Sequence, residues 1–325
     1  MGKKVLFSGI QPTGELHIGN YLGAIKNWVK IQSDYDSIFC VVDLHAQTIE
    51  YDQKEMPRRV QKTATVLLAC GLDPERCTLF KQSYIPGHSE LMWRLTTITP
   101  IGDLERMTQY KDKAQQHRDN INAGLFTYPV LMAADIMLYK AEVVPVGDDQ
   151  VQHLELTREI VRRFNHRFGE VFPEPKPLLS TAPRIRGLDG KAKMSKSLNN
   201  AIGLTESPDS IRKKLASAFT DPARLRRSDP GHPEVCNIFT LHGQFSPPAR
   251  CAEIAGACTA GMLGCVDCKR EFADRLIAEL EPIQARAAEL RAKPERVQEI
   301  LREGGRRCRA RSERTIADVN RAMGL

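Results

Sequence analysis

The expected architecture depends on one stretch near the amino terminus, Gly9-Ile10-Gln11-Pro12-Thr13-Gly14-Glu15-Leu16-His17-Ile18-Gly19-Asn20. It follows the apolar run Val5-Leu6-Phe7, which predicts a buried first strand, and it leads into residues 18–29, where apolar side chains recur at helical spacing. A strand that turns through glycines into a helix points free backbone N–H groups and the positive end of the helix dipole at one place. The stretch therefore predicts a phosphate-binding turn, although an ordinary tight connection could contain the same glycines.

Two polar residues in this turn favour the phosphate-binding interpretation. His17 and Asn20 are three residues apart, so both side chains can lie on one side of the first helical turn. An imidazole and an amide there can donate hydrogen bonds to phosphate oxygens as charge moves during a reaction. The stretch resembles the first ATP-binding motif of class I aminoacyl-tRNA synthetases. Asn20 stands where the common form has a second His, as it does in the tryptophan and tyrosine branch.

Composition limits the class of protein. The chain has 325 residues, of which 42% are hydrophobic, enough for one large domain or two smaller ones. It has no apolar run of about 18 residues, so we expect no membrane span. Nine cysteines, an odd number, without a secretory signal predict reduced thiols in a cytoplasmic protein, with a metal site among them. The net charge of +7 allows a basic face for an acidic partner but does not require one.

Apolar runs of the β type alternate with helix-type segments over the first part of the chain. The runs lie at 38–42, 78–80 and 143–146, and the helical segments at 56–69, 89–96, 129–140 and 149–163. Unbroken apolar strands between amphipathic helices predict a parallel sheet covered on both faces. We therefore expect an α/β fold with a Rossmann-type doubly wound parallel sheet over 1–190 and a smaller all-helical domain within 191–325.

The carboxyl-terminal part has a helical pattern from Cys268 to the end. We expect a polar break at Gly304-Gly305, and the last helix can pack back on the first domain. A dense basic run lies just beyond that break, and a solvated helix face is the simplest interpretation of it. Its members are Arg306, Arg307, Arg309, Arg311 and Arg314.

A second motif, Lys191-Ala192-Lys193-Met194-Ser195-Lys196-Ser197, follows Gly187 and Gly190. Lysines and small hydroxyl residues on a glycine-hinged loop can close over a triphosphate. A basic surface loop without a binding role is the alternative, but the string Lys-Met-Ser-Lys-Ser resembles the second motif of the same synthetase class. Both motifs occur in the expected order, which makes a chance match improbable.

The segment Tyr128-Pro129-Val130-Leu131-Met132-Ala133-Ala134-Asp135-Ile136 bears on the substrate. Pro129 suits the first position of a helix, which would make Tyr128 the cap and place Met132 and Asp135 on one face. A carboxylate only accepts hydrogen bonds and an indole N–H only donates, so Asp135 suits an indole. From the residues alone, an Asp135 paired with an arginine or the backbone inside the fold is an equal alternative.

Over essentially its whole length, the chain resembles bacterial tryptophanyl-tRNA synthetases. It is strongest over residues 7–14, 128–136 and 146–158. The resemblance implies that eight residues line a tryptophan pocket, in which Asp135 accepts the indole N–H: Phe7, His45, Tyr128, Met132, Asp135, Val144, Val146 and Gln150. It implies that the ATP site contains Gln11, Pro12, Thr13, Gly19, Asn20, Gly147, Asp148, Asp149, Ile185, Lys193, Met194, Ser195, Lys196 and Ser197. The catalytic residues it implies are His17, Asn20, Lys193 and Lys196.

The reaction implied by this resemblance has two steps. The carboxylate of L-tryptophan attacks the α-phosphate of ATP, which carries Mg²⁺, and pyrophosphate leaves. The terminal adenosine of tRNA(Trp) then attacks the adenylate, and the resemblance implies a homodimer. A tyrosine-specific synthetase and a nucleic-acid-binding regulator on an inactive synthetase fold are the alternatives. The Tyr128–Ile136 segment fits tryptophan better, and the intact motif residues speak against an inactive fold.

Four cysteines predict an inorganic centre. Cys236, Cys258, Cys265 and Cys268 have the spacing C-x21-C-x6-C-x2-C, and the last pair suits zinc or an iron–sulfur cluster. Unconnected buried thiols are the alternative. The spacing resembles that of the subset of tryptophanyl-tRNA synthetases with a [4Fe–4S] cluster in the anticodon-binding region. That resemblance implies a structural cluster that faces tRNA, and zinc at the same four cysteines remains the alternative.

Overall fold

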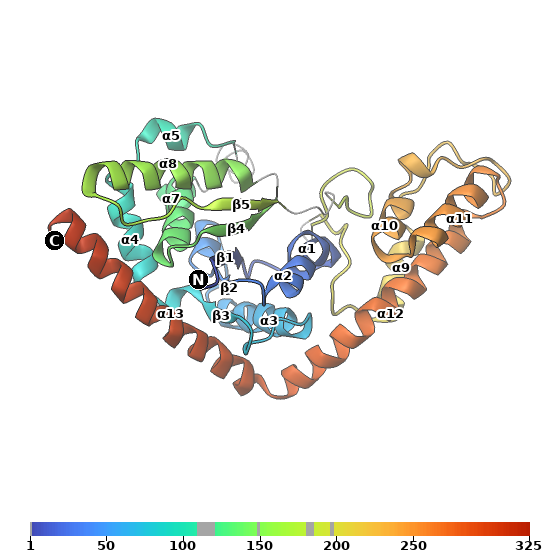
Figure 1. Ribbon diagram of the computed structural model, residues 1–325. Coiled ribbons are helices and arrows are strands. Elements are labelled where there is room, and N and C mark those ends of the chain that lie inside the picture. The colour runs from blue at the N-terminus through green and yellow to red at the C-terminus, as the bar shows by residue number, and fades with distance from the viewer. Residues whose placement is uncertain (1, 109–120, 148–149, 180–184, 196–197) are drawn as a thin grey trace.

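Five parallel strands form the central sheet of the protein. The structure is a computed structural model that describes residues 2–108, 121–147, 150–179, 185–195 and 198–325. The strand order is β3-β2-β1-β4-β5 (Figure 1). The strands are β1 (Val5–Ile10), β2 (Asp36–Val41), β3 (Thr78–Lys81), β4 (Val143–Val146) and β5 (Lys176–Leu179). This order confirms the predicted Rossmann-type α/β fold, and it reverses between β1 and β4, where such folds bind ligands.

Helices cover both faces of the sheet, as the unbroken apolar strands predict. Neighbouring residues of β1 point to opposite sides, so Leu6 joins one buried cluster and Phe7 the other. The helical elements of the described residues are α1 (Ile18–Asn20), η1 (Tyr21–Ile25), α2 (Lys26–Ile31), η2 (His45–Thr48), α3 (Met56–Ala69), η3 (Gln82–Tyr84), α4 (Gly87–Thr96), α5 (Ile101–Glu105), α7 (Ala123–Leu138), α8 (Val151–Phe168), α9 (Pro208–Ala216), η6 (Pro233–Val235), α10 (Asn237–Phe245), α11 (Pro248–Thr259), α12 (Cys265–Ala292) and α13 (Pro294–Met323). The helix expected after the first motif therefore contains a π-helical turn, η1, a feature that often accompanies functional sites.

The predicted start of α7 is wrong. Pro129 lies inside the helix, and the N-cap is Asn122, whose side-chain oxygen accepts a hydrogen bond from the Leu125 N–H at 2.9 Å. Asparagine is among the best N-cap residues, and it adds nearly two turns ahead of the proline. The proline costs a hydrogen bond within the helix, but Pro129 and the residues around it are buried, and that burial favours the helix. Asp135 stays on the face predicted for it.

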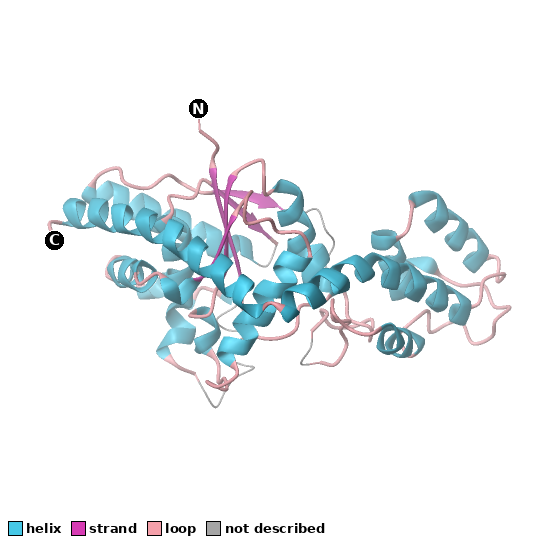
Figure 2. Ribbon diagram, turned by 90° about the horizontal axis from the view of Figure 1, so that it is seen from below, coloured by secondary structure: helices cyan, strands magenta, loops and turns pink. Residues whose placement is uncertain are grey.

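The predicted break at Gly304-Gly305 is also wrong, because α13 runs straight through both glycines. Figures 1 and 2 show α12 and α13 as two long helices that meet in a wide V, with α13 passing close to β3. A Cβ added at Gly304 would lie 2.0 Å from the Leu79 carbonyl oxygen, and one at Gly305 would lie 3.1 Å from the Tyr84 ring. The glycines therefore allow close approach of α13 to β3 and do not end the helix.

The basic run on α13 has two roles. Arg306, Arg307, Arg309 and Arg314 are exposed, as a solvated face requires. Three of the arginines also reach the sheet domain. Arg307 donates to the Pro74 carbonyl at 3.5 Å, Arg309 donates to the Tyr84 carbonyl at 2.7 Å, and Arg311 pairs with Asp36 at 2.6 Å. Part of the run thus attaches α13 to the first half of the chain. Within the described residues, no helix is both long and apolar enough to cross a membrane.

Candidate active site

A cavity of about 290 Å³ opens at the carboxyl ends of β1 and β4. The eight residues expected around tryptophan all line it: Phe7, His45, Tyr128, Met132, Asp135, Val144, Val146 and Gln150. Gly9 and Gln11 of the first motif line it too. The wall is mainly apolar and aromatic, with few polar groups, and the volume is at the small end of the usual range for ligand pockets. One substrate-sized site thus lies at the point where the strand order reverses.

Asp135 is the buried charge in this wall, with an exposed fraction of only 2%. Its Oδ2 lies 2.8 Å from His45 Nε2, and its Oδ1 lies 2.6 Å from His88 Nδ1 and 2.7 Å from Gln82 Nε2. Burial raises the pKa of this carboxyl, but the nearby histidines and their hydrogen bonds outweigh burial and lower it to about 2. Asp135 is therefore ionised at neutral pH.

Sequence reasoning missed His88 and Gln82. Neither residue belongs to a motif, and an isolated histidine or glutamine is more often an ordinary buried polar group. Gln82 is held in place because its Oε1 accepts the Leu44 N–H at 3.0 Å, which turns its amide nitrogen toward Asp135. The one available signal was the cost of burying Asp135, which requires donors somewhere in the fold.

The phosphate-binding end of the site begins at His17, at the start of α1. The His17 backbone N–H donates to Asn20 Oδ1 at 3.1 Å, a bond that uses the oxygen of the Asn20 amide and not its N–H groups. His17 Nδ1 is buried and has no hydrogen-bond partner among the described residues. Burial and then the charge of Lys193 lower the pKa of His17 to about 4. The imidazole is thus neutral at pH 7 and retains an unused polar nitrogen.

Backbone hydrogen bonds join the first motif to the segment that follows the second motif. The Ile18 N–H donates to the Ile202 carbonyl at 3.0 Å, and the Leu204 N–H donates to the Leu16 carbonyl at 2.9 Å. Met194 is buried, and its Cβ would lie 3.5 Å from a Cβ added at Gly19. The structure thus brings Lys193 and Met194 of the second motif beside His17 and Gly19 of the first.

The other residues expected in the ATP site do not all lie in one place. The Met194 N–H donates to the Ile185 carbonyl at 3.2 Å, so Ile185 lies beside the second motif, while Gly147 follows β4. Pro12 is buried, Ser195 is half-buried, and Thr13 is exposed in a separate hollow with the basic residues of α3. The four remaining residues lie outside the described part of the chain: Asp148, Asp149, Lys196 and Ser197.

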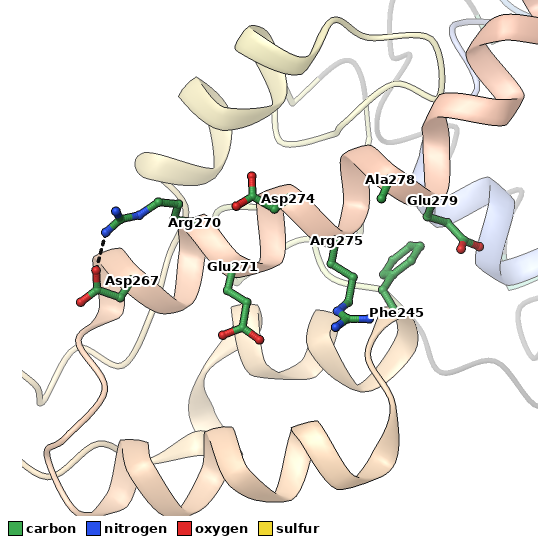
Figure 3. A pocket seen from close by; sticks show the side chains of 8 residues that line it. All are labelled: Phe245, Asp267, Arg270, Glu271, Asp274, Arg275, Ala278 and Glu279. Atoms are coloured by element: carbon green, nitrogen blue, oxygen red, sulfur yellow. Dashed lines mark hydrogen bonds and ion pairs between the residues drawn. The ribbon is translucent and has the colours of Figure 1, made fainter.

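A larger hollow, of about 670 Å³, lies away from this site along α12 (Figure 3). Four acidic and two basic side chains line it, and several of them are paired. Arg270 pairs with Asp267, and Glu271 accepts two hydrogen bonds from Arg250 at 2.7 and 2.8 Å. The carboxylates outnumber the basic groups in the lining, so this groove does not suit a phosphate or a carboxylate.

The four expected cysteine ligands converge in the helical lobe. Cys236 precedes α10, Cys258 ends α11, and Cys265 and Cys268 lie in the first turn of α12. Each thiol interacts electrostatically with the other three, and burial followed by these neighbours raises the pKa of Cys268 to about 12. Arg224 Nη1 lies 3.5 Å from Cys258 Sγ and 4.0 Å from Cys265 Sγ. Across the described ranges, no three or more His, Cys, Asp or Glu side chains are arranged to hold a metal ion.

Comparison with known proteins agrees with this geometry. The family described as tRNA synthetases class I (W and Y) matches residues 2–281, and the chain belongs to it. The chain is 49% identical over 325 residues to the tryptophan–tRNA ligase of Deinococcus radiodurans, with 98% of each chain covered. It is 44% identical over 330 residues to the tryptophan–tRNA ligase of Wolinella succinogenes, with 100% of both chains covered. These full-length relatives assign it, within the class, the activity of a tryptophan–tRNA ligase.

A solved structure supports the same assignment. The tryptophanyl-tRNA synthetase of Campylobacter jejuni, complexed with ADP and tryptophan, superposes with a TM-score of 0.89. The two chains share 34% identity, and the match covers 99% of this chain and 100% of that one. The predicted fold and enzyme class are therefore confirmed, while the role of each individual residue remains a prediction.

Proposed function

We propose that this synthetase activates L-tryptophan with ATP to tryptophanyl-adenylate and then transfers the tryptophanyl group to tRNA(Trp). The observation that carries the proposal is the ionised Asp135 in the wall of a mainly apolar cavity that includes Gly9 and Gln11 of the first motif. An indole ring has a large apolar surface and one N–H donor, which matches such a wall. Asp135 accepts the indole N–H in this proposal.

The other cavity residues hold the ring and the amino-acid end. Phe7, Met132 and Val144 supply apolar and polarisable surface for the indole. Gln150 and Tyr128 supply polar groups, and burial raises the pKa of Tyr128 to about 12, so its hydroxyl stays protonated. This arrangement orients the substrate carboxylate toward the first motif, where the α-phosphate must lie for in-line attack.

In the proposed ATP site the two motifs hold the phosphates from opposite sides. His17 and Asn20 contribute polar side chains at the start of α1, and Lys193 contributes a charge beside them. Lys196 stabilises the charge that develops on pyrophosphate, and Mg²⁺ arrives with the ATP. Catalysis then consists of positioning and electrostatic stabilisation, with no covalent step on the protein.

Charging of tRNA tests this proposal. We expect the purified protein to attach labelled tryptophan to tRNA in an ATP-dependent reaction that yields acid-precipitable label. An Asn20→Ala variant should charge more slowly, while a variant of the exposed residue His166 on α8, His166→Asn, serves as the control. Attachment of tyrosine in preference to tryptophan would refute the proposed substrate.

We further propose that the four converging cysteines hold a [4Fe–4S] cluster, with zinc as the alternative. The amino terminus of α12 and the Arg224 guanidinium favour a negatively charged thiolate centre, and they oppose the burial and mutual repulsion that raise the pKa of Cys268. A cluster is larger than a single ion, so thiols that converge without closing on one point suit it better. When bound, the cluster would supply metal–thiolate bonds that tie the start of α10 to α11 and α12.

Elemental analysis separates the alternatives for this centre. We expect anaerobically purified protein to be brown, with broad visible absorbance and iron and acid-labile sulfide in equal amounts. Stoichiometric zinc in a colourless protein would overturn the cluster, and protein with neither metal would overturn both forms of the proposal.

We also propose a cytoplasmic homodimer, in which the catalytic domain (1–190) precedes a part (191–325) with the second motif and the helical anticodon-binding lobe. Apolar side chains on and beside α4 and α5 support association, since Trp93 is 70% exposed and Ile101 66% exposed. Sedimentation should give twice the 36.5 kDa mass of one chain, and Trp93→Glu should shift it toward one chain. A monomeric wild-type protein would contradict the dimer.

A further inference from the structure

A buried hydrogen-bonded chain continues from Asp135 away from the substrate cavity. His88 Nδ1 lies 2.6 Å from Asp135 Oδ1, and His88 Nε2 lies 2.8 Å from the Tyr139 hydroxyl. The exposed fractions of Asp135, His88 and Tyr139 are 2%, 0% and 4%. His88 does not line the cavity, so it acts on a ligand there only through Asp135.

The proton positions in this chain follow from which groups can donate. An ionised carboxylate only accepts, so His88 must donate its Nδ1–H to Asp135. With its proton on Nδ1, the ring can use the lone pair of Nε2 to accept from the Tyr139 hydroxyl at 2.8 Å. Burial, together with nearby thiols and Asp135, raises the pKa of Tyr139 well above its usual value, so the hydroxyl keeps its proton. Tyr139 therefore fixes the tautomer of His88 that faces Asp135.

The acceptor capacity of Asp135 is nearly used up by these donors. A carboxylate has roughly four lone-pair positions, two on each oxygen. His88 and Gln82 occupy both positions of Oδ1, and His45 occupies one of Oδ2. Within the described part of the chain, this leaves a single position on Oδ2, the oxygen shared with the cavity-lining residue His45.

We propose that His88 is a positioning residue for recognition of the indole N–H, because it occupies Asp135 Oδ1 and thereby reserves one acceptor on Oδ2 for the substrate. The inference rests on the proposed role of Asp135 and extends it to a residue outside the pocket. Without the His88 donor, Gln82 alone occupies Oδ1, so each oxygen of the carboxylate has one open acceptor position. The acceptor is then no longer held at one place, and the enzyme loses selectivity for a ring that has an N–H.

Close packing around His88 restricts the movement of its ring. Its ring stacks on Phe80 with centroids 5.9 Å apart and planes inclined at 20°. Its neighbour Gly87 lies so close to α13 that an added Cβ would be 2.0 Å from Ser312 Oγ. The Cys308 thiol of α13 adjoins the Tyr139 hydroxyl at the far end of the chain. α13 thus packs against the end of the hydrogen-bonded chain that lies farthest from the cavity.

The experiment compares tryptophan with an analogue in which sulfur replaces the indole N–H. The ratio of kcat/KM for the two substrates in ATP–pyrophosphate exchange reports the N–H contact alone, because the rest of the molecule is matched. His88→Asn places an amide N–H near the position of Nδ1 and keeps a donor to Asp135. His88→Gln reaches toward the position of Nε2 and leaves Asp135 Oδ1 without that donor. Tyr139→Phe removes only the hydroxyl that fixes the tautomer, and His166→Asn is the control.

We expect the wild type and His166→Asn to prefer tryptophan roughly tenfold to a hundredfold, the range for one hydrogen bond to a charged acceptor. His88→Gln should lose most of this preference through a higher KM for tryptophan, with the KM for ATP unchanged. His88→Asn should keep most of the preference, and Tyr139→Phe should fall between the two.

Failure of the two proposals can be told apart. A wild-type enzyme that uses both substrates equally would refute the role of Asp135 itself. A wild type that discriminates, together with a His88→Gln variant that discriminates equally well, would refute the role of His88 alone. Equal losses in both His88 variants, accompanied by a higher KM for ATP, would show a merely structural residue and would also overturn the inference.

Discussion

Asp135 combines full burial with a retained charge. Three donors offset the loss of hydration, and two of them come from residues that the sequence did not single out, His88 and Gln82. The eight residues that line the cavity could be predicted because the resemblance to a known family extends over essentially the whole chain. The donors could not, because a hydrogen bond between α4 and α7 depends on tertiary contact that no local pattern encodes.

Removal of the carboxylate should weaken tryptophan binding specifically. Asp135→Ala leaves the indole N–H without an acceptor in a desolvated cavity, which should cost about 1–3 kcal/mol of binding free energy. Calorimetric titration with tryptophan, and separately with ATP, measures this cost. Unchanged tryptophan binding would remove Asp135 from the pocket, and an equal loss for both ligands would indicate a general disruption of the site.

The low pKa of Asp135 also predicts how stability depends on pH. The folded-state pKa of about 2 lies below the ordinary value of 3.8, so ionised Asp135 stabilises the fold above pH 4. This contribution, roughly 2 kcal/mol by the usual conversion, is lost as the pH falls from about 4 toward 2. Urea unfolding at a series of pH values should show a steeper acid loss for the wild type than for Asp135→Asn. Identical slopes would contradict the assigned ionisation.

Helices and strands were predicted most accurately where their apolar residues recur at regular spacing. The bounds of α3 and β4 match the prediction, and those of β2 and β3 lie within two residues of it, because their apolar residues follow the spacing of the element they form. β5 was missed because it is an edge strand with mostly exposed residues and a proline at position 177. The predicted start of α7 was wrong because Asn122 caps the helix ahead of Pro129. The predicted break in α13 was wrong because the two glycines at 304 and 305 serve a close contact with β3 and do not end the helix.

The glycine contact between α13 and β3 gives a prediction for this element. Gly304→Ala adds a methyl group where the Leu79 carbonyl already lies, so α13 must shift, at a cost of about 1–3 kcal/mol of unfolding free energy. Gly243→Ala in α10 is the matched control, since nothing lies within 4 Å of its Cβ position, and it should stabilise by up to about 1 kcal/mol. Urea unfolding measures both variants. A Gly304→Ala protein as stable as the control would show that the contact is loose.

At the scale of the whole molecule, the V of α12 and α13 links the cysteine lobe to the sheet domain. α12 begins at Cys265, and α13 packs against β3 and reaches the Tyr139 end of the buried network. In the function proposed above, the sheet domain activates the substrate and the helical lobe contacts tRNA, and α12 and α13 join these two parts.

This separation predicts that damage to the lobe spares activation. Cys265→Ser should lower the metal content and slow tRNA charging, because the proposed centre ties α10, α11 and α12 together. Tryptophan-dependent pyrophosphate exchange should stay close to the wild-type rate, since Cys265 neither lines the cavity nor belongs to either motif. Metal analysis with both assays on one preparation checks this, and loss of exchange in step with charging would contradict it.

The central claim is that a buried carboxylate selects tryptophan for reaction with ATP between the two motifs. ATP–pyrophosphate exchange without tRNA, driven by each standard amino acid in turn, measures this most directly. We predict exchange with tryptophan far above that with every other amino acid. Exchange with tyrosine at a comparable rate, or no exchange with any amino acid, would contradict the account.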